Sequence, residues 1–111
     1  MPEMLKPHWY YMLLSLAGGA KHGLAVARDV RDLSGDRVRL WPATLYGSLE
    51  ELAIRGWIEE IDDGSRHRPD DSERKRYYAL TRTGHAAIAA ETERLADLVK
   101  LARGLARKQN A

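Results

Sequence analysis

The chain has 111 residues, of which 44% are hydrophobic and 31% are charged, as in a single globular domain with a well-solvated surface. It contains no cysteine, which excludes disulfide scaffolds, cysteine zinc sites and thiol catalysis. Its net charge of +2 permits a nucleic-acid partner without requiring one. The sequence shows neither a secretory signal pattern nor an apolar run near the roughly 20 residues of a membrane span, so we expect a cytoplasmic protein with no membrane partner.

Two short helices are predicted at the start of the chain. The stretch "HWYYMLLSLA" lies between Pro7 and a pair of glycines that begins at Gly18, which predicts a helix over about 8–17. In "LAVARDVRDLSG" (24–35) the apolar residues share one face and the charges lie opposite. Gly35 stands where the C-terminal cap of this helix belongs.

A third helix is predicted from Pro42 to Gly56. Proline suits the first turn of a helix because its missing N–H is not needed there. Apolar residues recur at helical spacing and face one way, namely Leu45, Leu49, Leu52 and Ala53. Three short helices joined by glycine-rich or basic turns indicate a helix-turn-helix core.

A β-hairpin is predicted after the third helix. The segment "GWIEEI" is too loosely periodic for a helix and predicts a strand over about 57–61, while "RYYAL" predicts the return strand over about 76–80. Residues 62–75 between them are polar and contain a glycine and a proline. They are expected to form the long tip of the hairpin.

A long terminal helix is predicted over about 82–107, with Thr81 or Thr83 as its N-cap. Its apolar residues lie close to heptad positions a and d, and Glu91 interrupts this seam. Such a stripe on a terminal helix is typical of a dimer contact. The residues predicted for that contact are Trp9 from the first helix and Ile88, Leu95, Leu98, Val99, Ala102 and Leu105 from the last.

The order of elements is helix, helix, helix, hairpin and long helix. The expected fold class is therefore mainly α with a small β-hairpin, a winged helix-turn-helix to which a dimerisation helix is appended. We expect a DNA-binding winged domain over residues 1–80, and a C-terminal dimerisation helix with a short tail over 81–111.

Four motifs carry a resemblance to a known family, namely "HG" at 22–23, "PATLY" at 42–46, "RGWIE" at 55–59 and "RYYALTRTG" at 76–84. Together, over about residues 8–90, they resemble the PadR family of bacterial transcriptional regulators. The resemblance implies a homodimeric repressor that reads an inverted-repeat operator in double-stranded DNA. The third helix would enter the major groove and the hairpin would lie along the phosphate backbone. Many members respond to a small-molecule effector or to stress, and this chain resembles the short type with one C-terminal helix.

The leading turn of the third helix is predicted to face DNA. Ala43, Thr44 and Gly47 lie on its outward half and Tyr46 flanks them. Threonine contacts base edges or a thymine methyl, and tyrosine contacts phosphate. Because this turn holds no Arg or Lys, the other DNA contacts are expected from neighbouring residues: Lys21, His22, Arg37, Arg39, Trp41, Arg66, Arg68, Arg74, Lys75 and Arg76.

Two positions near the third helix depart from the family pattern: Trp41 stands where the family commonly has a small polar residue, and Ala43 replaces a frequent glycine. Trp41 is expected to pack against the core ahead of the third helix, or otherwise to face DNA or a ligand. His22 is expected to order the turn into the second helix.

The other polar residues suggest no catalytic or metal site. The four histidines are scattered in the sequence, and the acidic residues near 59–63 are expected to form a solvated face. We therefore expect no metal, no cofactor and no enzymatic activity. Trp9, Tyr10 and Tyr11 are interpreted as core or dimer packing, or alternatively as the wall of a site for a flat effector.

Two other functions stay open from the sequence. One is a protein-interaction adaptor that keeps the fold without operator binding, which the neutral leading turn and the low net charge favour and the basic hairpin opposes. The other is a small-molecule sensor whose ligand pocket matters more than its affinity for DNA.

Overall fold

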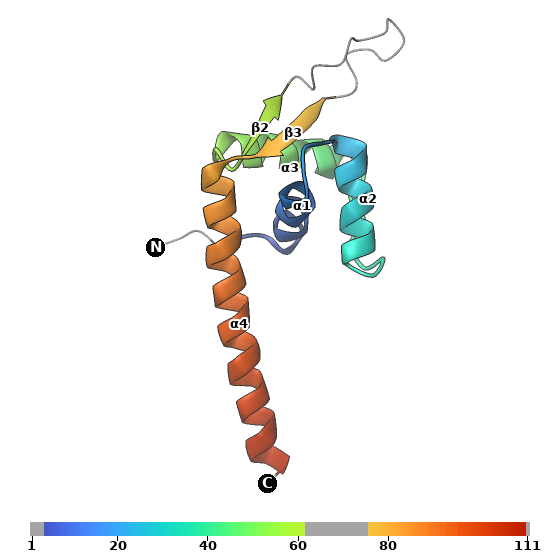
Figure 1. Cartoon of the computed structure of the whole chain (residues 1–111). Helices are drawn as coiled ribbons and strands as arrows, with labels where there is room; N and C mark the ends of the chain where they lie inside the picture. Colours follow the sequence, from blue (N-terminus) through green and yellow to red (C-terminus); the bar gives the residue numbers. More distant parts are fainter. Residues whose placement is uncertain (1–3, 62–75, 111) are drawn as a thin grey trace, which may run out of the picture.

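The computed structural model describes residues 4–61 and 76–110. Within these residues the chain forms four helices and three short strands (Figure 1). In chain order these elements are α1 (Pro7–Ala17), β1 (Lys21–His22), α2 (Gly23–Leu33), α3 (Pro42–Ile54), β2 (Ile58–Ile61), β3 (Tyr77–Leu80) and α4 (Arg82–Asn110). The predicted fold class, mainly α with a small hairpin and a long last helix, is confirmed. The predicted hairpin tip, residues 62–75, lies outside the described residues.

The core lies where α1, α2 and α3 meet one face of the small sheet. It consists of a leucine just before α1, apolar side chains on the inward faces of the three helices, and one residue from each of the two longer strands. These residues are Leu5, Trp9, Met12, Leu13, Leu16, Val26, Val30, Leu45, Leu49, Leu52, Ile58 and Tyr78. Trp9 is only 2% exposed, and its ring meets that of Trp57 edge-on at 6.1 Å between centroids. The prediction that Trp9 lies at a dimer interface is therefore wrong, because the side chain is buried in the core of its own chain.

The sheet has three antiparallel strands in the order β1-β3-β2. In β2 and β3, Ile58 lies opposite Leu80, and on the other side of β3 Lys21 lies opposite Tyr78. The two-residue strand β1 was not predicted, because two residues are too few to show an alternating pattern. It ties the start of α2 to the base of the hairpin.

Two helix ends follow the predicted backbone chemistry. Gly35 (φ +62°) ends α2 and Gly56 (φ +75°) ends α3, each in the left-handed region that favours glycine. Asp36 follows Gly35 with φ +66° and is the single non-glycine residue with positive φ within 4–61 and 76–110.

Hydrogen bonds hold the start of the long helix α4 against the turn between α3 and β2. Thr81 is its N-cap, since its Oγ1 accepts the N–H of Gly84 at 3.0 Å and donates to the carbonyl of Gly56 at 2.6 Å. The Thr81 N–H donates to the carbonyl oxygen of Trp57 at 3.1 Å. The second half of α4 extends beyond every other element (Figure 1). No helix in the described segments is long and apolar enough to cross a membrane.

Candidate nucleic-acid interface

The leading end of α3 is exposed to solvent. Ala43, Thr44 and Gly47 lie on its outer side, because the leucines of the helix turn inward. An added Cβ on Gly47 would meet no atom within 4 Å. In Figure 1, α3, the start of α2 and the hairpin lie together at one end of the molecule, opposite the C-terminal end of α4.

Trp41 is 69% exposed, so the prediction that it packs against the core is wrong. The segment before α3 explains why, since it is not helical and Trp41 itself has an extended backbone (φ −71°, ψ 155°). Side chains alternate along extended backbone. Val38 and Leu40 pack against the core, and Arg39 and Trp41 face solvent.

Tyr46 has a packing role that sequence reasoning missed. It is 42% exposed, yet an added Cβ on Gly23 would lie 3.2 Å from its Cε1 and 3.3 Å from Leu49 Cδ1. The first turn of α2 therefore rests against one side of the Tyr46 ring. The remainder of the Tyr46 side chain is open to solvent.

Lys21 and His22 both make structural contacts with α2. Lys21 is half-buried, forms an ion pair with Asp29 and donates to the carbonyl of Ser15 at 2.8 Å. The bond from Lys21, followed by one from the Ser15 hydroxyl, holds the pKa of Asp29 below its usual value. His22 Nδ1 accepts the N–H of Ala25 at 3.2 Å, which confirms that this side chain orders the turn.

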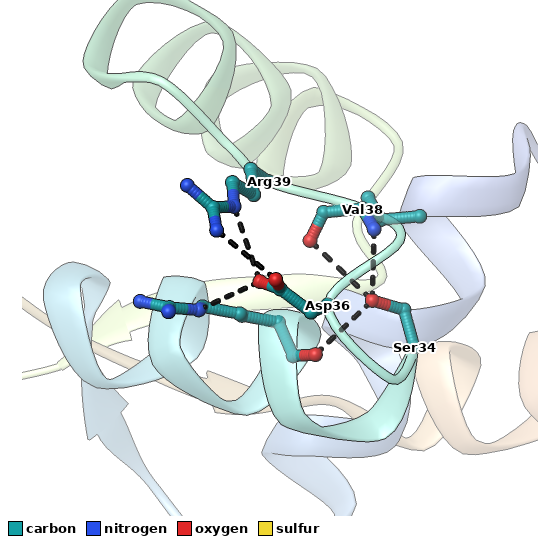
Figure 2. A network of polar contacts seen from close by, with 5 residues as sticks. Ser34, Asp36, Val38 and Arg39 are labelled. Carbon is teal, nitrogen blue, oxygen red and sulfur yellow. Dashed lines mark hydrogen bonds and ion pairs between the residues drawn. The ribbon is translucent and has the colours of Figure 1, made fainter.

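A polar network centred on Asp36 joins the end of α2 to the segment ahead of α3 (Figure 2). Asp36 accepts from Arg39 Nε at 3.1 Å, from Arg39 Nη2 at 3.0 Å and from Arg31 Nε at 2.9 Å. These bonds, the pair from Arg39 first, lower the pKa of the Asp36 carboxyl. Ser34 closes the loop, because its Oγ accepts the Val38 N–H at 2.9 Å. Neither Arg31 nor Asp36 was predicted, since only the loop geometry brings them together.

The predicted basic residues lie at separate places around α3. Arg37 and Arg39 are exposed in the loop that precedes the helix. Arg76 is exposed at the base of the hairpin, 3.6 Å from Glu60 across the strand pair. Arg66, Arg68, Arg74 and Lys75 lie outside the described residues.

The helix α4 carries most of the predicted dimer residues on its exposed length. Leu98, Val99, Ala102 and Leu105 are exposed, Leu95 is half-buried, and Ile88 packs against the core. Three of the exposed side chains are large and apolar, which is unusual on a surface that only meets water.

Glu91 breaks the apolar seam of α4 for a reason that the sequence did not reveal. It is 6% exposed and accepts two bonds from Arg94, at 2.7 and 2.8 Å, which hold its pKa below the usual value. The pair borders a cavity of about 450 Å³ beside Met4 and Trp57. The predicted effector residues are placed differently: Tyr10 and Tyr11 pack on the core and do not line this cavity.

Among the described residues, no three His, Cys, Asp or Glu side chains come close enough together to hold a metal ion.

The chain matches the model of the "Transcriptional regulator PadR-like family" over residues 12–90, more than half of its length. It belongs to the PadR-like family. This is a family of transcriptional regulators and not of enzymes. The winged helix and the long last helix are thus the fold of a PadR-like regulator.

Solved structures of other regulators share the fold. A PadR family transcription regulator from hypervirulent Clostridium difficile R20291 has a TM-score of 0.72 at 18% identity, over 90% of this chain and 98% of that chain. A transcriptional regulator from Clostridium thermocellum has a TM-score of 0.70 at 19% identity, over 86% of this chain and 89% of that one. H. salinarum RosR has a TM-score of 0.67 at 23% identity, over 96% and 99%.

A relative in sequence is the "Uncharacterized 37.1 kDa protein in transposon TN4556" of Streptomyces fradiae. It is 30% identical over 87 residues, which are 78% of this chain. The chain spans only 22% of the length of that relative.

Two PadR-like motifs have a clear structural reason in this chain. In "HG", His22 caps α2 and the missing side chain of Gly23 lets Tyr46 and Leu49 approach. In "LTRTG", Thr81 caps α4, and Gly84 lies against the backbone of Trp57, where an added Cβ would be 2.0 Å from the carbonyl oxygen.

Proposed function

We propose that this PadR-like regulator binds double-stranded DNA through the leading end of α3 and acts as a homodimeric repressor at an inverted-repeat operator. The observation that carries the proposal is the exposed, uncharged turn around Thr44, together with the exposed Arg37 and Arg39 in the loop that precedes α3. A short polar side chain at the start of a recognition helix suits contact with base edges. The flanking arginines suit contact with phosphate.

The exposure of each residue indicates whether it would contact bases or phosphates. Thr44 and Gly47 are exposed and free to approach bases. Tyr46 would reach the DNA with its exposed side only. Arg37, Arg39 and Arg76 would neutralise phosphates, as would the four basic residues of the hairpin tip. Because the turn offers no arginine to guanine, we expect modest specificity, to which DNA shape contributes.

The exposed apolar residues of α4 support the dimer. Leu98, Val99 and Leu105 would be covered by the same helix of a second copy, as in a symmetric contact. Two copies of α3 would then lie about 34 Å apart, one turn of the duplex, and read the two halves of a pseudo-palindrome.

Duplex binding at two salt concentrations tests the proposal. The protein is titrated with DNA from its own upstream region and with a scrambled duplex, at about 50 and 200 mM salt. The proposal predicts preference for the upstream duplex and a steep loss of affinity with salt. An adaptor without operator binding would show neither, and a random-sequence selection that returned no duplex would refute the DNA-binding function.

A further inference from the structure

Asp36 is an acidic residue in the loop that joins the end of α2 to α3, the proposed DNA-binding helix. It lies three residues before Arg39 and six before Pro42, the first residue of α3. Its backbone is in the left-handed region (φ +66°), directly after Gly35 in the same region. Asp is one of the few residues that adopt this conformation readily. Its N–H donates to the carbonyl of Arg31 at 2.8 Å, which fixes the carboxylate beside the end of α2.

The carboxylate of Asp36 orients two arginines and leaves them able to donate further. It binds Arg31 through Nε alone, and Arg39 through Nε and Nη2 (Figure 2). A guanidinium has five N–H groups. Arg31 therefore keeps both of its terminal NH₂ groups for other acceptors, and Arg39 keeps one NH₂ group entirely.

These arginines line a cleft next to the exposed indole of Trp41. The cleft has a volume of about 290 Å³ and lies between the outer face of α2 and the segment that leads into α3. Arg28 lies three residues before Arg31, so both project from the same face of α2. The residues of the cleft are Ala27, Arg28, Arg31, Arg39, Leu40 and Trp41. The lining holds three guanidiniums and no carboxylate. Asp36 binds two of them and Asp29 lies close enough to Arg28 to interact with its charge, so one positive charge is left in excess.

We infer that this cleft binds a phosphate of the DNA strand beside the groove entered by α3, and that Asp36 is the residue that positions its arginines. Pre-oriented guanidiniums suit the oxygens of a phosphate, and the indole of Trp41 offers an apolar surface to the adjoining sugar. The inference rests on the proposed DNA-binding function. It adds Arg28 and Arg31 to the contact surface and gives an acidic residue a favourable role in binding an acidic polymer.

Two substitutions that each remove one negative charge distinguish a residue that positions the arginines from one that only repels DNA. Asp36→Asn keeps a residue that tolerates the left-handed backbone but weakens the bonds to both arginines. Asp32→Asn removes an equal charge from an exposed position on the last turn of α2, four residues away. Repulsion alone predicts that both variants bind DNA as tightly as the wild type or more tightly.

The inference predicts that Asp36→Asn weakens binding of the upstream duplex about threefold to tenfold at 50 mM salt, because the arginines must then be ordered on binding. Asp32→Asn should bind as well as the wild type or better. Arg31→Gln should lower the slope of log affinity against log salt by about one, whereas Asp36→Asn should leave the slope unchanged because no phosphate contact is deleted.

The outcomes separate this inference from the proposed function. A wild type that binds the duplex, with Asp36→Asn binding as tightly as Asp32→Asn, would overturn the inference alone. An unchanged salt slope for Arg31→Gln would also overturn it. A wild type that binds no duplex would refute both. Thermal unfolding of each variant serves as the control for folding, and we expect little change because both ion pairs of Asp36 are exposed.

Discussion

Gly84 joins the long helix to the winged domain, and replacing it by alanine tests how that junction is built. An added Cβ would lie 2.0 Å from the carbonyl oxygen of Trp57, 2.9 Å from its carbonyl carbon and 2.7 Å from Leu80 Cδ1. That oxygen is already fixed, because it accepts the Thr81 N–H at 3.1 Å. The backbone must therefore move, and the N-cap of α4 moves with it.

The size of the effect follows from three contributions. Overpacking costs about 1–3 kcal/mol, and losing the hydrogen bond between Thr81 and Trp57 costs about 0.5–1.5 kcal/mol. Alanine gains about 0.5–1 kcal/mol over glycine inside a helix. The free energy of unfolding should therefore fall by about 0.5–4 kcal/mol, and Tm by about 2–20 °C for a chain of this size.

Thermal unfolding without DNA measures this effect, and Gly47→Ala is the matched control. Gly47 is also helical, but an added Cβ there meets no atom within 4 Å, so this variant should raise Tm by a few degrees. If Gly84→Ala also raised Tm, the close approach of α4 to Trp57 would be refuted.

Three further substitutions test separate parts of the structure. Burial, and then the charge of Lys6, lower the pKa of His8 from its ordinary value of 6.5. The unfolded chain therefore binds a proton more readily than the folded one, and the free energy of unfolding should fall as the pH drops below 6.5. His8→Gln should remove this dependence, and a variant whose Tm fell as steeply as that of the wild type between about pH 7 and 5 would contradict it. Lys21→Met should lower Tm, because Asp29 loses its main partner. The slope of log affinity for DNA against log salt should fall by well under one, and a fall of one full unit would mean that Lys21 contacts a phosphate. Leu98→Glu should give a monomer in analytical ultracentrifugation, whereas a dimer of unchanged affinity would place the subunit contact elsewhere.

The helices and the hairpin could be predicted because each has a local cause. Glycines at 35 and 56 end helices in the left-handed region, as their positions after apolar periodic segments suggested. The last helix runs to Asn110, a few residues past the predicted end, because nothing in "RKQN" breaks a helix. The strand β1 could not be predicted, since its two residues pair only with a strand more than fifty residues later in the chain.

The candidate site was predicted in outline, and its errors come from long-range packing. Whether Trp41 faces the core depends on an extended segment in which Leu40 takes the inward position. Tyr46 could be placed beside the outer face of α3, but its contact with Gly23 depends on how α2 crosses α3. The role of Asp36 depends on a left-handed turn that no pattern of apolar residues encodes.

The most direct test of DNA binding by α3 is the affinity of Thr44→Glu for the upstream duplex at about 50 mM salt. Thr44 is the third residue of α3, where a negative charge favours the helix, so the fold should be kept. A carboxylate near a phosphate should cost about 1–4 kcal/mol, a loss of roughly fivefold to a thousandfold. Ala89→Glu adds the same charge to an exposed position on α4 and should leave the affinity nearly unchanged. Equal affinities for the two variants would mean that the leading end of α3 does not contact DNA.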